Sequence, residues 1–343
     1  MRKVTLVIIV LILTLVLWGQ TKITPLPDLK KPGSFYMDDT RMYVVEEVSV
    51  YIYSLKDLKL VKKFGKYGEG PREMMLNPQY GPMILDVRGD EILVHSFSKL
   101  SRFTKNGVYK SETRLPNPLI FRIQKFGKYL IASRLIQENN TTMRALNVYD
   151  DHMNKVGQIV RVPHVFTSGK GWKVLKSNPI TVVHKDKLIY GWENALKLNV
   201  MDTGFKILYT ITHEVDRIKV TDKDRKIIID YIKKNPRTKD IYEQLKPIRF
   251  PVYFPAMIDV FPDVDKLYIY TFNKKEMDDV NEYEFLVFDI KGKYLDSIFL
   301  PLRMMNPLRS YPITIHKGYL YQLVEDIEKE QWSLQEIKIE LST

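Results

Sequence analysis

Ten residues of this chain, GKYGEGPREM at 65–74, have the glycine content of a phosphate-binding loop. A P-loop reads G-x4-G-K-[ST], because its backbone amides and its lysine contact the phosphate oxygens. Gly65 and Gly70 have this spacing, but Pro71 and Arg72 stand where the lysine and the hydroxyl residue belong. Proline also lacks the backbone N–H that such a loop would donate. The sequence therefore predicts no nucleotide site here.

A structural turn explains the same glycines better. Gly68 and Gly70 also begin a dinucleotide-binding pattern, but Glu73 stands at the position of its third glycine. Glycine adopts positive φ without steric cost, and proline stiffens a turn. We interpret Gly65, Gly68, Gly70 and Pro71 as a structural turn between two strands, with Glu73 accepting backbone hydrogen bonds from it.

The other reactive side chains form no recognisable catalytic or metal-binding motif. The chain has no cysteine, which excludes thiolate zinc sites and cysteine nucleophiles. None of the six histidines has another histidine two or four positions away, a spacing that builds metal sites. His184 and His316 stand in equivalent turns, VVHKDKL and TIHKGYL, which internal repetition explains better than catalysis does. The sequence therefore names no catalytic residue and no metal ligand.

Six strand–turn–strand segments run through the chain and must position these side chains. Each has two short apolar strands around a polar or glycine-containing turn, the pattern of a β-hairpin. A third strand follows most of them and ends at an aspartate or a similar turn residue, and these turns recur about every 50 residues. The hairpins occupy residues 35–45, 83–94, 122–132, 181–191, 257–270 and 313–323.

Short antiparallel strands in groups of four, repeated about every 45 to 50 residues, are typical of propeller blades. We therefore predict an all-β, six-bladed β-propeller. The sixth unit has only three strands, the last of them within 333–341. We expect residues 22–27, KITPLP, to supply its fourth strand, so that an N-terminal strand closes the last blade and removes an exposed sheet edge. Residues 20–343 would then form one propeller domain.

One stretch, residues 221–246, departs from the strand pattern. Thr221 and Asp224 have the spacing of a capping box. Apolar residues then recur at helical spacing until Pro236 ends the run. We predict a small helical insertion of two short helices between the fourth and fifth blades, packed as a cap over the propeller.

At residues 65–107 the chain resembles an NHL repeat. Its G-x-G-P-x-E part is also similar to a large group of exported six-bladed propellers of the TolB-like and NHL types, most of them without a known function. Arg72 and Met74 depart from the G-P-G-E-F that those proteins usually carry. The resemblance covers one repeat of six, and it implies the fold rather than an activity. The matching residues are Gly68, Gly70, Met75, Pro78, Asp86, Gly89, Ile92 to Val94, Ser96, Arg102-Phe103 and Gly107.

In a propeller, the links between blades and the loops between second and third strands share one face, and here these are the long segments. Arginines and aromatic residues gather in them, and such residues are common at binding sites. We expect this loop-rich face to bind a protein, a peptide or a glycan without catalysis. The expected binding residues are Tyr67, Arg72, Glu73, Trp172, Lys173, Arg249, Arg303 and Arg309.

The alternative is a metal-assisted hydrolase or lyase with its site at the mouth of the propeller channel. Some six-bladed propellers hold calcium in the channel, and inner-strand acids such as Asp86 and Asp259 would then converge on that ion. His95 is the histidine that we would most expect to face the channel. Apart from such a calcium ion, the sequence predicts no cofactor.

The first 19 residues predict export. Arg2 and Lys3 precede a 15-residue run, Val4 to Trp18, that is apolar apart from two threonines. This is the order of a secretory signal, and the run is short for a membrane-spanning helix, which needs about 20 apolar residues. We expect a cleaved signal or an N-terminal membrane anchor, and a periplasmic, secreted or outer-side membrane-anchored protein. The net charge is +12, but the lysines are scattered, so nucleic acid is not an expected partner.

Overall fold

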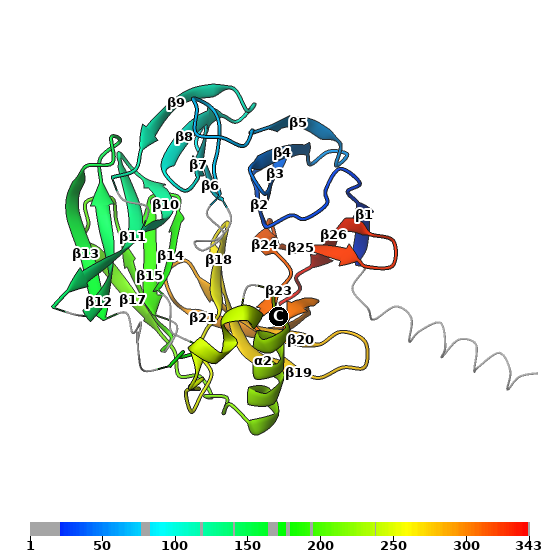
Figure 1. Cartoon of the computed structure of the whole chain (residues 1–343). Helices are drawn as coiled ribbons and strands as arrows, with labels where there is room; N and C mark the ends of the chain where they lie inside the picture. The colour runs from blue at the N-terminus through cyan, green and yellow to red at the C-terminus, as the bar shows by residue number, and fades with distance from the viewer. Residues whose placement is uncertain are drawn as a thin grey trace, which may run out of the picture.

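The computed structural model describes residues 21–341, apart from 77–82, 117–118, 140, 164–170, 176–178, 193–194 and 237. The described strands form six four-stranded antiparallel sheets, arranged as blades around a central channel (Figure 1). Neighbouring innermost strands contact one another all the way around the ring. The predicted six-bladed β-propeller is confirmed. The expected signal or anchor at 1–19 lies outside the described residues.

In blades one to five the strands follow one another from the channel outward in chain order. The first blade consists of β2 (Ser34–Met37), β3 (Arg41–Glu46), β4 (Ser49–Ser54) and β5 (Leu60–Phe64). The second consists of β6 (Ile84–Arg88), β7 (Glu91–His95), β8 (Lys99–Thr104) and β9 (Tyr109–Arg114). The third consists of β10 (Ile120–Phe126), β11 (Tyr129–Glu138), β12 (Thr141–Tyr149) and β13 (Lys155–Pro163). The fourth blade consists of β14 (Pro179–His184), β15 (Lys187–Trp192), β16 (Lys197–Met201) and β17 (Ile207–Thr212). The fifth consists of β18 (Asp259–Asp263), β19 (Lys266–Lys275), β20 (Glu282–Asp289) and β21 (Tyr294–Pro301). The sixth contains β24 (Ile313–His316), β25 (Tyr319–Asp326) and β26 (Gln331–Lys338).

The N-terminal strand completes the last blade, as predicted. β1 (Lys22–Pro25) pairs antiparallel with β26 and takes the outermost position. Two hydrogen bonds extend the junction: Leu26 N donates to Trp332 O at 2.8 Å, and Trp332 Nε1 donates to Lys30 O at 2.9 Å. The two ends of the propeller are thereby joined within one sheet.

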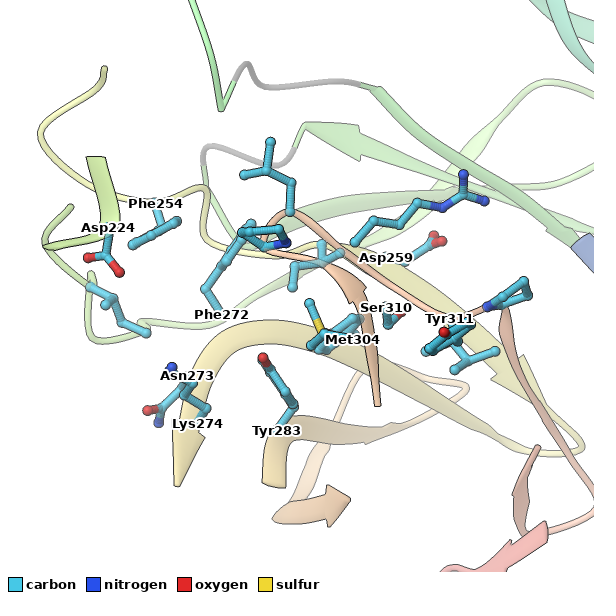
Figure 2. Close-up of a pocket in the computed structure, with 18 of the residues that line it drawn as sticks. Asp224, Phe254, Asp259, Phe272, Asn273, Lys274, Tyr283, Met304, Ser310 and Tyr311 are labelled. Atoms are coloured by element: carbon cyan, nitrogen blue, oxygen red, sulfur yellow. The ribbon is translucent and has the colours of Figure 1, made fainter. Parts of the chain in front are cut away.

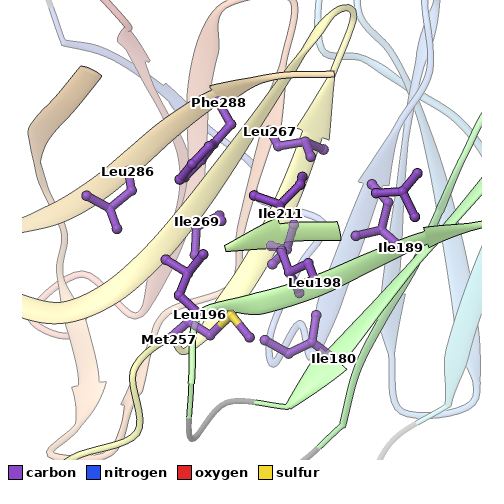
Figure 3. Packing of buried hydrophobic residues seen from close by; sticks show 12 residues of the cluster. Ile180, Ile189, Leu196, Leu198, Ile211, Met257, Leu267, Ile269, Leu286 and Phe288 are labelled. Carbon is purple, nitrogen blue, oxygen red and sulfur yellow. The ribbon is translucent and has the colours of Figure 1, made fainter. Parts of the chain in front are cut away.

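The core lies between adjacent blades. In one cluster, Ile189 and Leu198 of the fourth blade pack with Leu267 and Phe288 of the fifth, and all four are buried (Figure 3). Because successive side chains of a strand point to opposite faces, each blade packs forward with one face and backward with the other. This packing holds the innermost strands, and the side chains they carry, around the channel.

The helical insertion consists of α2 (Asp222–Lys234) and the 3₁₀ helix η1 (Lys239–Leu245), as predicted. The capping box is present: Asp224 N donates to Thr221 Oγ1 at 3.2 Å, and Thr221 N donates to Asp224 Oδ2 at 2.9 Å. The buried side of α2, at Ile228, packs against the link that precedes the fourth blade.

The link between the fifth and sixth blades contains a small hairpin that the sequence pattern did not predict. Its strands are β22 (Met304–Asn306) and β23 (Arg309–Ser310). In the part of the chain that the structure describes, no helix has the length and apolar character needed to cross a membrane.

Candidate functional site

The glycine-rich link between β5 and β6 is a tight turn. Gly65 and Gly68 have φ angles of +106° and +150°, which side chains with a Cβ rarely adopt. The carboxylate of Glu73 accepts a hydrogen bond from Gly70 N at 3.0 Å and pairs with Lys66 Nζ at 2.8 Å. Glu73 therefore holds the turn itself together.

Arg72 and Tyr67 lie beside this turn, toward the outside of the second blade. Arg72 N donates to Glu112 Oε2 at 3.2 Å, and its guanidinium lies 5.0 Å from the centre of the Tyr109 ring. Both partners belong to β9, the outermost strand, so Arg72 is directed away from the channel. Tyr67 is exposed. A binding role for these residues and Glu73 stays a prediction.

Trp172, Lys173 and Arg249 belong to the cap around the helical insertion. Trp172 N donates to Leu245 O, and Arg249 N donates to Trp172 O, both at 2.8 Å. The Trp172 side chain packs beside Ile228, whereas Lys173 and Arg249 are exposed. The three residues lie together, but they contribute to neither of the two central cavities described below.

Arg303 and Arg309 flank the β22–β23 hairpin. The backbone of Arg303 is fixed by Gln322, whose side-chain oxygen accepts from Arg303 N and whose Nε2 donates to Arg303 O, each at 3.0 Å. Arg309 Nη2 donates to Gly33 O at 3.3 Å. Of the eight expected binding residues, Arg309 alone contributes to the central cavities that the structure describes.

The loop-rich face contains a cavity of about 850 Å³ at the end of the channel, which we call the mouth cavity (Figure 2). Its walls come from α2, the fifth blade and the β22–β23 link. Phe254 and Phe272 stack with ring centroids 4.8 Å apart and form one apolar wall. Tyr283 and Tyr311 add aromatic surface elsewhere in the cavity. Cavities of roughly 300–1,000 Å³ with this mixture of apolar and polar groups are typical of ligand sites.

The floor of the mouth cavity continues into a second space of about 870 Å³ within the propeller, the channel cavity. Three charged residues line both: Arg122, Asp259 and Arg309. Arg122 lies in β10, where the pairing with β11 shifts between Phe121 and Gln124, and its backbone has a φ of +51°. Its side chain is exposed to the cavities and makes no hydrogen bond or ion pair with another described residue.

The mouth cavity has an excess of basic groups. Asp224 is held by the helix cap, and Glu276 pairs with Lys274 at 3.0 Å. Burial raises the pKa of Asp259, and the charge of Arg122 opposes that rise. Among the described lining residues, the basic ones are Arg122, Lys219, Lys223, Lys274 and Arg309, and the acidic ones are Asp224, Asp259 and Glu276. This balance favours a ligand that carries negative charge.

The inner-strand acid Asp86 connects two blades. Its carboxylate accepts from Arg88 Nε at 2.8 Å and from Lys125 N of the third blade at 2.9 Å. Asp259 accepts from the backbone of the next residue, Val260 N, at 2.9 Å. Within the described residues no three histidine, aspartate or glutamate side chains gather as metal ligands would. A calcium ion in the channel stays an untested expectation.

The two equivalent histidines, His184 and His316, both line the channel cavity at its end away from the mouth. Burial lowers the pKa of each. His95, at the end of β7, is buried and belongs to neither central cavity, and its Nδ1 has no hydrogen-bond partner among the described residues.

Two solved structures share the whole architecture. One is a member of the DUF4221 family from Bacteroides vulgatus, with a TM-score of 0.54 and 12% identity over 95% of this chain and 98% of that one. The other is a protein of Bacteroides fragilis described as exported, with a TM-score of 0.52 and 11% identity over 93% of this chain and 95% of that one. No protein-family model and no curated protein matches the chain. At such identities the similarity shows the propeller fold and does not test the resemblance to NHL repeats.

Proposed function

We propose that this protein is an exported, non-enzymatic binding protein that receives an anionic peptide segment in its mouth cavity. Arg122 carries the proposal, because an arginine without a hydrogen-bonding partner among the described residues points into the junction of two cavities. Arginine binds a carboxylate with two parallel hydrogen bonds, and such charge-assisted bonds are the strong ones. Arg309 lies on the same floor and supplies a second positive charge.

The aromatic wall favours a peptide over a glycan. Phe254 and Phe272 offer apolar ring faces, and Met304 and Leu308 extend this surface. Apolar side chains of a peptide bury against such a wall, whereas a sugar needs a larger number of hydrogen-bonding groups around it. The export part of the proposal is supported by the apolar N-terminal run and by the likeness to a protein described as exported.

The two acids considered for the hydrolase or lyase alternative are both engaged with other groups of the protein. Asp86, one of the two acids considered for it, has its carboxylate bound to Arg88 and to a backbone amide. The other, Asp259, lies within the influence of the positive charge of Arg122, and its carboxylate accepts a hydrogen bond from Val260 N. These contacts serve the structure and the charge balance of the floor.

Selection from a displayed library of random peptides tests the proposal. We expect enriched peptides to carry a carboxylate next to apolar residues, and Arg122→Gln to weaken their binding about 10- to 100-fold, the value of a lost charged hydrogen bond. Fluorescence anisotropy of a labelled peptide gives the dissociation constants. Arg72→Gln is the matched control, because Arg72 is an exposed arginine that also has positive φ, but on the outer side of the second blade.

Two results would contradict the proposal. One is a set of selected peptides that bind the Arg122→Gln variant as tightly as the unaltered protein. The other is capture on a glycan array with no peptide enriched, which would make the ligand a sugar.

A further inference from the structure

Every blade begins its outermost strand at the same end of the propeller. In the fourth blade Ile207, the first residue of β17, pairs with Met201, the last residue of β16. The turn between His184 and Lys187 lies at that end too. The other blades have the same arrangement. We call this end the turn face; it is opposite the loop-rich face and its mouth cavity.

Exposed apolar side chains lie at or next to the start of the outermost strand in all six blades, and in four blades (Val61, Val156, Leu208 and Leu295) they occupy the same bulge of the strand pairing. Each lies within the first two residues of an outermost strand or directly before it, and each is between 39% and 58% exposed. Isolated exposed apolar residues are ordinary, but their recurrence at one end of the outermost strand in every blade is not explained by chance exposure. This apolar rim consists of Ile23, Val61, Val108, Val156, Leu208 and Leu295.

Lysines accompany the apolar rim. Lys22 directly precedes Ile23, and Lys155 directly precedes Val156. Lys62 and Lys63 directly follow Val61. The turn aspartates next to the rim direct their carboxylates toward backbone amides of their own turns, as Asp202 does to Gly204 N at 3.0 Å and Lys206 N at 2.9 Å. Exposed apolar tips between lysines are typical of surfaces that bind at the interface of anionic membranes.

The N-terminal sequence joins the propeller at this same face. Lys22, the first residue of β1, pairs with Glu336 near the end of β26, and that end lies at the turn face. Only residues 19–21 separate β1 from the apolar run at 4–18. Three residues reach at most about 10 Å. If the run is inserted in a membrane, the turn face is held next to the lipid.

We propose that the apolar rim docks on an anionic bilayer surface, with the turn face toward the lipid and the mouth cavity away from it. A planar partner is needed to touch six positions spread around one ring, and a bilayer is such a partner. The lysines then meet anionic headgroups, and the apolar side chains enter the interfacial region.

Site-specific labelling of the full chain tests this orientation. Because the protein has no cysteine, a single substitution provides one labelling site. Val61→Cys and Leu208→Cys place an environment-sensitive fluorophore on the rim. Val252→Cys and Met277→Cys are matched controls on the loop-rich face, since the exposed fractions are 57% and 60% for the valines and 44% and 47% for Leu208 and Met277. The labelled proteins are reconstituted into phosphatidylcholine–phosphatidylglycerol vesicles that contain a lipid-attached quencher.

We expect quenching at positions 61 and 208 and none at 252 and 277. Replacing Lys62 and Lys63 by glutamine should reduce the quenching at position 61, as should vesicles of phosphatidylcholine alone. The proposal is overturned if the rim labels are quenched no more than the controls, or if quenching at the rim is the same without anionic lipid. Peptide binding in the mouth cavity is a separate measurement on the opposite face, so the two proposals fail independently.

Discussion

Arg122 illustrates what a single residue can add to a regular sheet. Its positive φ accompanies a change of register in β10, and together these direct the side chain into the junction of the two cavities. Bulges and left-handed backbone at residues other than glycine are costly and tend to occur at binding sites. In the sequence, Arg122 stands between Phe121 and Ile123 and looks like an ordinary outward-facing strand residue. Strand periodicity therefore could not identify it.

The expected binding residues also show that the position of a residue in the sequence does not fix the direction of its side chain. Arg309 was predicted from its position in a long link, and it does line the mouth cavity. Arg72 was predicted by the same argument, but its guanidinium packs on Tyr109 of the outermost strand. Loop length shows on which face a residue lies, and it does not show whether the side chain points toward the channel or away from it.

His95 predicts a loss of stability in acid. Burial lowers the pKa of His95 from 6.5 to about 4. Between these values the unfolded chain binds a proton that the folded protein excludes, so the free energy of unfolding falls as the pH falls. The full effect is about 3 kcal/mol. We expect His95→Leu to remove this part of the pH dependence, measured by urea unfolding from pH 7.5 to pH 4.

His152→Leu serves as the control, because His152 is exposed in the turn that precedes β13. Equal pH dependence in the His95→Leu variant and the unaltered protein would show that the pKa of His95 is the same in the folded and the unfolded state.

At the scale of elements, the turns could be predicted because each contains a side chain that accepts hydrogen bonds from the backbone N–H groups of the same turn. Asp150 Oδ1 accepts from His152 N and Asn154 N, and Asp289 Oδ1 accepts from Lys291 N and Lys293 N, at 2.8 to 2.9 Å. Such side-chain acceptors are local, so they leave a repeat that can be seen in the sequence. The β22–β23 hairpin has such an acceptor too, since Asn306 Oδ1 accepts from Leu308 N at 2.9 Å, but its strands of three and two residues are too short to show in the strand pattern.

The packing of the N-terminal strand, and of the residue that follows it, gives a prediction for the free energy of unfolding. Leu26, directly after β1, is fully buried against the first and last blades. We expect Leu26→Ala to lower the free energy of unfolding by about 2–5 kcal/mol, because it leaves a cavity. Ile23→Ala, on the same strand but 58% exposed, should cost less than about 1 kcal/mol. Chemical denaturation measures both, and equal costs would contradict the burial of Leu26 at the junction.

At the scale of the whole molecule, β1 makes the propeller a closed ring. Deleting residues 20–30 removes β1, buried Leu26 and Leu29, and the acceptor of the Trp332 indole. We expect the melting temperature to fall by about 10 °C or more, since two buried leucines alone are worth several kcal/mol. Calorimetry should show the loss, and size-exclusion chromatography should show association through the open edge of β26. A melting temperature equal to that of the unaltered protein would contradict closure.

The pairing of β1 with β26 also sets an order of events during synthesis. The bond from Trp332 to Lys30 joins residues 302 positions apart. At about 5–20 residues per second, the ribosome needs about 15 to 60 seconds between making one partner and the other. The first strand therefore waits unpaired until almost the whole propeller has been translated. Blades one to five each consist of consecutive strands, so the last blade alone depends on a strand made at the start of synthesis, and the ring closes only after β26 has been made.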